Sequence, residues 1–305
     1  MRSAWGLLRR TYDEWSADRA PRLAAALAYY TTFSLAPLLV VLIALAGLVF
    51  GTEAVRGQLD DQIRGLLGDD AAKAVQEMVQ SATAHPSSGI LATGLSLIAL
   101  ILGATGVFGE LQDSLNTIWD VRAKPGRGLR GLLRDRLLSF GMVLAIAFLL
   151  TVSLVLSALI AGAGAFVGGH AGALAPLWHA IDGLVSISIL TLLFAAIFKW
   201  LPDAEIAWRD VWIGAVVTSV LFTAGKIVLG LYLGRSSTVS VYGAAGSLVV
   251  LLIWVYYSAQ ILFFGAELTQ VYANQYGTHV RPAPNAERIE AGRAGGRPVP
   301  APQAS

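Results

Sequence analysis

The sequence lacks cysteine and carries little charge. None of its 305 residues is a cysteine, which excludes disulfide bonds and thiolate metal sites. Only 14% of the residues are charged and 55% are hydrophobic, which leaves too little charge to cover a soluble protein of this size. No phosphate-binding glycine loop is present, and no metal-ligand spacing connects the four histidines, His85, His170, His179 and His279. The composition therefore predicts an integral membrane protein and disfavours a metal-dependent enzyme.

Six segments are long and apolar enough to span a membrane. A membrane-spanning helix needs about 20 largely apolar residues. Such segments cover residues 27–50, 90–108, 137–161, 177–199, 211–233 and 244–268. If both termini lie in the cytoplasm, 17 of the 22 Lys and Arg residues fall on that side, as the positive-inside rule requires. The predicted fold is all-α and polytopic, with six transmembrane helices and both termini cytoplasmic.

The segments outside the spans complete the predicted domain organisation. Residues 1–26 form a cytoplasmic amphipathic arm without the pattern of a cleaved signal peptide. Residues 27–274 form the membrane domain, in which 51–89 is an outer connection with two short amphipathic helices. The second span continues into an interfacial cytoplasmic helix that ends near Trp119. Residues 275–305 are rich in Pro, Gly and Ala, and we expect a disordered cytoplasmic tail.

Polar side chains line one face of the last predicted span. At 100° per residue, Tyr256, Gln260 and Glu267 share an arc of about 80° with Gln270 and Asn274. A charged side chain in hydrocarbon costs about 2.5 to 3.5 kcal/mol on insertion scales, so this stripe should face protein or water rather than lipid. We therefore expect Glu267 to be paired, close to the interface, or functional.

Polar residues and a proline also share one face of the first span. The proline removes a backbone donor and frees a carbonyl in the cytoplasmic half of that helix. The sequence predicts a polar cavity, open to the cytoplasm, whose lining residues come from the first and last spans: Tyr29, Tyr30, Ser34, Pro37, Tyr256, Gln260 and Glu267. The alternative is a purely structural role. Pro37 would then only bend the first span, with hydroxyl groups satisfying the backbone at the bend, and Glu267 would lie at the lipid head groups or bond to a neighbouring helix.

Two further polar groups are candidates. Asp182 and Lys226 lie about 8 to 12 Å below the outer surface in the fourth and fifth spans, at 1.5 Å per residue, and their opposite charges predict an intramembrane ion pair. Such a pair is either a functional gate or a structural contact, unless the lysine extends alone to the interface.

Glu110, Asp113 and Asn116 lie on the interfacial helix. Since no nucleophile or metal ligand accompanies these carboxylates, an amphipathic surface or coupling element is favoured over acid–base catalysis.

Four stretches resemble the YihY/BrkB family of bacterial inner-membrane proteins, also labelled ribonuclease BN-like. They are LAAALAYYTTFSLAPLLVVLIALAGLVFG in the first span, TGVFGELQDSLNTIWD after the second, KWLPDAEIAWRDVWIGAVVTSVLFTAGK into the fifth, and VYGAAGSLVVLLIWVYYSAQILFFGAELTQVYA in the last. The resemblance covers most of residues 22–272 and implies a six-helix protein of the bacterial inner (plasma) membrane. Family members have been associated with serum resistance and with envelope-lipid transport.

Together these features predict a transporter or flippase-like protein for an amphiphilic or anionic envelope solute, and not an enzyme. The alternative is a non-transporting envelope scaffold or a serum-resistance, virulence-associated protein. A ribonuclease is disfavoured because it would need a metal-binding carboxylate or histidine cluster. We expect no catalytic residue, metal or cofactor. The expected partners are membrane lipids and a small-molecule or lipid substrate, without nucleic acid, and a homo-oligomer is compatible with the sequence.

Overall fold

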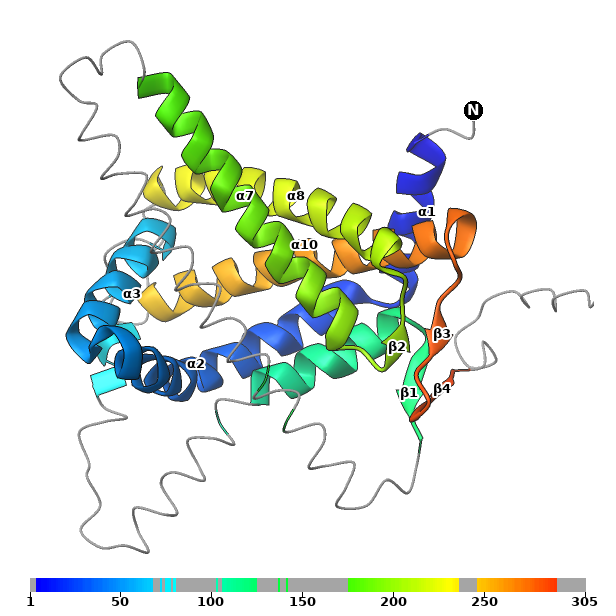
Figure 1. The fold of residues 1–305 in the computed structure, drawn as a ribbon, viewed down its shortest axis with the longest axis horizontal. Helices are drawn as coiled ribbons and strands as arrows, with labels where there is room; N and C mark the ends of the chain where they lie inside the picture. Colours follow the sequence, from blue (N-terminus) through cyan, green and yellow to red (C-terminus); the bar gives the residue numbers. More distant parts are fainter. Residues whose placement is uncertain are drawn as a thin grey trace, which may run out of the picture.

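A computed structural model describes the membrane-spanning and connecting elements of the chain in part. The described residues are 4–67, 72, 75–77, 79–80, 103, 106–124, 137, 141, 175–235 and 246–289. They are mainly helical, and residues 106–118 form a further helix that carries no label in Figure 1. The labelled helices are α1 (Ala4–Ala17), α2 (Ala20–Phe50), α3 (Thr52–Leu67), α7 (Ala175–Trp200), α8 (Trp208–Arg235) and α10 (Gly246–Tyr276).

Four of these helices are long and apolar enough to cross a membrane. The crossing segments are 20–40 in α2, 183–200 in α7, 208–229 in α8 and 248–276 in α10. Successive helices of this set run in opposite directions, so that α2 and α8 begin where α7 and α10 end (Figure 1). We call this the sheet end, because the short strands lie there, and we call the opposite end the α3 end. The predicted spans at 90–108 and 137–161 lie mostly outside the described residues.

The strands form two small antiparallel sheets. β1 (Val121–Ala123) pairs with β4 (Ala286–Arg288), and β2 (Ala204–Glu205) pairs with β3 (Arg281–Pro282). The C-terminal segment therefore joins the connection after helix 106–118 to the connection between α7 and α8 (Figure 1).

This pairing corrects the predicted disordered tail at its near end. In the structure α10 continues to Tyr276, and residues 281–288 contain β3 and β4. Val280 and Ala286 are buried in the core, so these residues have both backbone pairs and apolar burial to offset their ordering entropy. Residues 290–305 lie outside the described part.

Helices α8 and α10 approach closely through reciprocal glycine and threonine contacts. A Cβ atom placed on Gly214 of α8 would lie 1.6 Å from Oγ1 of Thr269, and one on Gly265 of α10 would lie 1.8 Å from Oγ1 of Thr218. Each threonine hydroxyl donates within its own helix, to the carbonyl of Gly214 or Gly265, at 2.7 Å in both cases. Small residues at such spacing are typical of membrane helix contacts. We call these four residues the Gly–Thr clasp.

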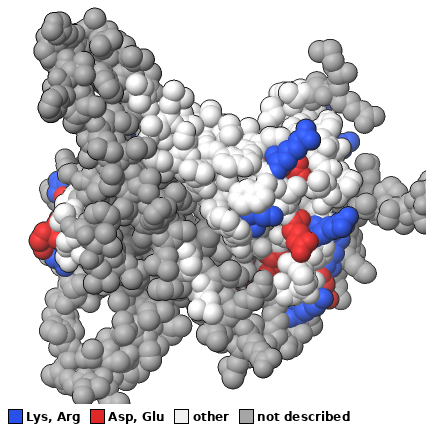
Figure 2. Space-filling model, viewed as in Figure 1, with Lys and Arg blue, Asp and Glu red and all other residues white. Residues whose placement is uncertain are grey.

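Charged side chains gather at the two ends of the described structure. On the face in Figure 2, Lys, Arg, Asp and Glu lie at the sheet end and on α3, and the described surface between them is uncharged. At the sheet end Trp208 lies between Trp200 and Trp212, with ring centroids 5.5 and 6.4 Å apart, and all three are exposed. Exposed tryptophans of this kind are typical of the membrane–water interface. The apolar band between two charged ends matches a lipid environment.

Candidate functional site

A group of four carboxyl side chains lies at the sheet end. Glu14 belongs to α1, Asp18 to the turn between α1 and α2, Asp120 to the connection after helix 106–118, and Glu267 to α10. The other three are the charged groups that act on Glu267. We call these four residues the carboxyl cluster.

Glu267 is the most enclosed member of the carboxyl cluster. Its exposed fraction is 0%, and neither of its carboxylate oxygens has a hydrogen-bond partner within the described part of the chain. The side chain of Asp18 lies close enough for the two carboxyl groups to interact electrostatically, but no hydrogen bond joins them. Because an ionised carboxylate without donors is costly to bury, such a group in a spanning helix is a candidate for function.

Two left-handed residues turn the chain at the carboxyl cluster. Arg19 has φ 53° and separates α1 from α2, and the N–H of Asp18 donates to the carbonyl of Glu14 at 2.9 Å. Asp120 has φ 52° and ends the helix that precedes it; aspartate tolerates this conformation better than most residues. Gln270 of α10 donates to Oδ2 of Asp120 at 3.1 Å, which fixes this carboxylate beside α10.

The surroundings raise the pKa of two members of the cluster. Burial, and then the charge of Asp120, raise the pKa of Asp18 from 3.8 to about 6. Desolvation and the charge of Glu14 raise the pKa of Asp120, while Arg288 and the hydrogen bond from Gln270 lower it. Glu14 and Asp120 are exposed, Asp18 is half-buried and Glu267 is buried. The carboxyl cluster thus extends from the protein surface to the buried face of α10.

Replacing Asp18 by asparagine is expected to stabilise the protein at pH 7. Since the folded-state pKa is raised, the folded protein binds more protons than the unfolded chain between about pH 4 and 6, and stability falls as the pH rises through that range. The gain should be on the order of 1 to 2 kcal/mol after allowance for solvent screening, and should vanish below about pH 4. Thermal unfolding at several pH values measures it. Asp13→Asn, on the exposed side of α1, is the matched control, and an equal gain there would contradict this origin.

A second buried carboxylate, Asp203, lies between the two sheets. Oδ2 of Asp203 accepts from Nδ2 of Asn116 at 3.1 Å and from Nε2 of Gln112 at 3.5 Å, and Oδ1 accepts from Nδ2 of Asn285 at 2.7 Å. Its own N–H donates to Oδ1 of Asn116 at 2.8 Å. We call these four residues the Asp203 cluster. It connects helix 106–118, the connection after α7 and the C-terminal segment.

The predicted interfacial residues divide between this cluster and the surface. Asn116 is buried in the Asp203 cluster, whereas Asp113 is exposed. Burial and the neighbouring Asp113 raise the pKa of Glu110. Sequence reasoning missed Asp203. The one available signal was an aspartate directly after Pro202 in a short connection between two spans.

The residues predicted to line a cavity have different surroundings. Tyr29 and Tyr30 are exposed, with fractions of 60% and 45%. Ser34 is buried against Gly106, whose added Cβ would lie 3.2 Å from the serine Oγ, and Pro37 lies against Gly103 at 3.0 Å by the same measure. Ser34 and Pro37 therefore pack against the neighbouring helix. Among the described residues they do not join Glu267 in an open cavity.

The remaining predicted positions are partly outside the described side chains. Tyr256 and Gln260 are half-buried on α10. Lys226 is exposed on α8, beside a small hollow that Phe222 and Trp254 help to line. The side chain of Asp182 lies outside the described part, so the ion pair stays a prediction. No set of three or more His, Asp or Glu residues in the described ranges could hold a metal ion.

The fold and its surface define a class of protein. Long apolar helices in alternating directions, with charge at both ends, make this chain a polytopic α-helical integral membrane protein. Residues 11–290 match the family described as Virulence factor BrkB, and the chain belongs to this family. The resemblance seen in the sequence is thereby confirmed.

Curated relatives are described as UPF0761 membrane proteins. One from Rhodospirillum centenum is 32% identical over 270 residues, which is 87% of this chain and 57% of the relative. One from Pseudomonas aeruginosa is 30% identical over 254 residues, 82% of this chain and 59% of the relative. The chain thus spans less than two thirds of the length of these relatives. No solved structure matches.

Proposed function

We propose that this protein is a transporter or flippase-like protein for an amphiphilic or anionic envelope solute, without enzymatic activity, and that the carboxyl cluster couples it to protons. The observation that carries the proposal is Glu267, a carboxylate enclosed in a membrane-spanning helix without a hydrogen-bond partner among the described residues. Ionisable groups in spanning helices are expensive and mark proton relays and ion pathways in pumps and transporters.

The other carboxyls provide a route for protons between Glu267 and the surface. The side chain of Asp18 is adjacent to Glu267, and its pKa of about 6 lets it both accept and release a proton near neutral pH. Asp120 and Glu14 are exposed next to it. In this proposal a proton passes from the surface through Asp18 to Glu267. Its arrival neutralises the buried Glu267 carboxylate on α10.

The proposal includes six spans in the bacterial inner membrane, with the sheet end in the cytoplasm. The distribution of basic residues and the alternating helix directions support this orientation. Because the chain has no cysteine, the labelling of single introduced cysteines reports its orientation in the membrane directly. In spheroplasts a membrane-impermeant maleimide should label Glu53→Cys at the α3 end, and should label Glu205→Cys only after permeabilisation. The reverse pattern would contradict the orientation.

Glu267→Gln is expected to reduce translocation at least tenfold, because the amide has nearly the same shape but cannot bind and release the proton. Proteoliposomes with fluorescent anionic, zwitterionic and cationic phospholipid analogues, read by dithionite quenching at pH 6 and pH 8, measure it. Glu110→Gln, a carboxylate outside the carboxyl cluster, is the matched control and should keep its activity. Full activity of Glu267→Gln would remove this residue from the mechanism.

A non-transporting envelope scaffold is the second candidate. The complete enclosure of Glu267 and the packing of Ser34 and Pro37 favour it, because a scaffold needs no continuous polar path. If wild-type protein moves none of the three classes of analogue faster than protein-free liposomes do, the transporter proposal fails and the scaffold is retained.

A further inference from the structure

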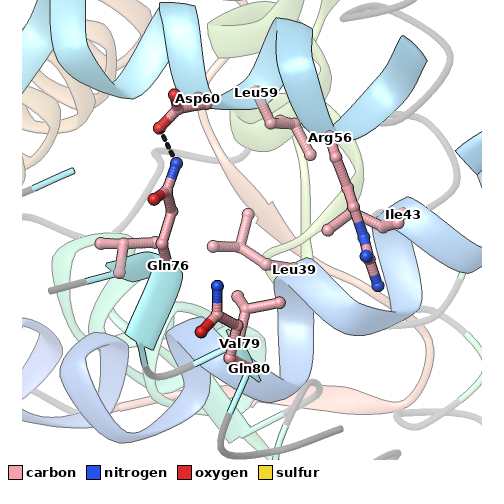
Figure 3. A pocket seen from close by; sticks show the side chains of 9 residues that line it. Leu39, Ile43, Arg56, Leu59, Asp60, Gln76, Val79 and Gln80 are labelled. Carbon is pink, nitrogen blue, oxygen red and sulfur yellow. Dashed lines mark hydrogen bonds between the residues drawn. The ribbon is translucent and has the colours of Figure 1, made fainter. Parts of the chain in front are cut away.

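A cavity of about 220 Å³ lies at the α3 end, away from the carboxyl cluster. Its walls come from α2, α3 and the helical residues between 75 and 80 (Figure 3). Leu39 and Ile43 of α2 and Leu59 of α3 supply apolar surface. Asp60, Arg56 and Gln76 supply polar groups around it. We call this space the α3 cavity.

The acidic and basic groups at the α3 cavity differ in how well each is paired within the protein. Asp60 accepts from Nε of Arg64 at 2.7 Å and also from Gln76, so its charge is neutralised within the protein. Arg56 meets Glu53 only at 3.8 Å, and the side chain of Glu53 is 90% exposed. Such exposed pairs contribute little. Figure 3 shows Arg56 extending from α3 along the edge of the cavity beside Ile43. The guanidinium can therefore turn to an anion at the cavity without leaving a buried charge unpaired.

We propose that the α3 cavity binds an amphiphile with one acyl chain and an anionic head group. The chain would lie on Leu39, Ile43 and Leu59, and the head group would meet Arg56. A volume of about 220 Å³ is below the ~300 to 1,000 Å³ typical of sites for drug-sized ligands, so it suits one chain segment rather than a two-chain lipid. Leu39 belongs to the membrane-spanning part of α2, which places this apolar wall of the cavity within the membrane-spanning region.

This inference rests on the proposed function, because it names the solute class and a place where the solute would bind. Binding can nevertheless be measured without transport. The absence of cysteine allows a single environment-sensitive fluorophore to be placed on Gln80→Cys at the cavity, in full-length protein in phosphatidylcholine nanodiscs. Gly57→Cys is the matched control, since Gly57 is exposed on α3 and an added Cβ there meets no atom within 4 Å.

Titration with lysophosphatidylglycerol should change the fluorescence of the Gln80→Cys label saturably and leave the Gly57→Cys label unchanged. Arg56→Gln should weaken the binding of this anionic amphiphile about tenfold, because a charge-assisted contact is lost, and should leave the weaker response to lysophosphatidylcholine unaltered. An equal response of the two labels, or equal affinities for the two amphiphiles, would overturn the proposal.

Variants separate the failure of this site from the failure of the proposed function. Glu267→Gln should bind lysophosphatidylglycerol as the wild type does, because the carboxyl cluster is at the opposite end. Binding without translocation would sink the transporter proposal and keep the site. Translocation without binding would sink the site and keep the transporter. Leu59→Trp, which fills the cavity, should abolish the binding response, and an undiminished response in this variant would also overturn the site.

Discussion

Replacing Asp203 by asparagine is expected to destabilise the protein by about 1 to 3 kcal/mol, even though the two side chains have nearly the same shape. Both carboxylate oxygens of Asp203 accept hydrogen bonds, Oδ1 from Asn285 and Oδ2 from Asn116 and Gln112. An asparagine must turn its NH₂ group toward one of these amide donors. The donor on that side then loses its acceptor in a site where Asp203 is only 4% exposed.

Thermal unfolding of the purified protein in detergent measures this effect. Glu205→Gln, an exposed carboxylate two residues along the chain, is the matched control and should change stability little. Limited proteolysis should also become faster within residues 277–289, since Asn285 holds this segment to the cluster. If Asp203→Asn and Glu205→Gln unfold at the same temperature, the hydrogen bonds of the Asp203 cluster do not contribute to stability.

Gly265→Ala should disrupt the Gly–Thr clasp between α8 and α10. The added methyl group would meet the Oγ1, Cβ and Cγ2 atoms of Thr218 at 1.8, 2.9 and 3.0 Å, which the helices can relieve only by moving apart. Overpacking of this kind costs about 1 to 3 kcal/mol and occasionally more. The loss exceeds any gain in helix propensity, which is at most about 1 kcal/mol for Gly→Ala.

A compensating change identifies the cause. Thr218→Gly removes all three atoms in conflict, so the double variant should recover part of the unfolding temperature lost in Gly265→Ala. Gly109→Ala is the matched control, because an added Cβ there has no neighbour within 4 Å and should leave stability equal or higher. Additive losses in the double variant would show that the clasp is not the source of the effect.

The long helices were predictable because their signal is local. Apolar length alone placed α2, α7, α8 and α10 correctly, and the start of α2 at Ala20, earlier than the predicted residue 27, reflects Pro21, which fits the first helical turn. Strands of two or three residues carry no periodicity, and β1 and β4 are paired across more than 160 residues of chain. The amino-acid composition of the C-terminal segment therefore could not predict its strands.

The candidate site was predictable only in part, for the same reason. Glu267 stood out because a carboxylate in an apolar helix is unusual whatever surrounds it. Its neighbours Glu14 and Asp18 looked like ordinary charges on an amphipathic arm, since only the packing of α1 against α10 brings them to it. Likewise, Asn116 looked like a surface residue until the fold placed Asp203 beside it.

The two small sheets also determine at what stage of synthesis the fold of this protein can be completed. β1 is made long before β4, and β2 long before β3, so the β2–β3 sheet must await residues 281–282 and the β1–β4 sheet must await residues 286–288. Until then, the Ile289 N–H cannot reach the carbonyl of Asp120, and Asn285 cannot reach Asp203. The helices from α1 to α10 are therefore all synthesised before the strands at the sheet end can pair. Closure of the strands is a late step of assembly, in which a segment made after α10 joins two connections that were made before it.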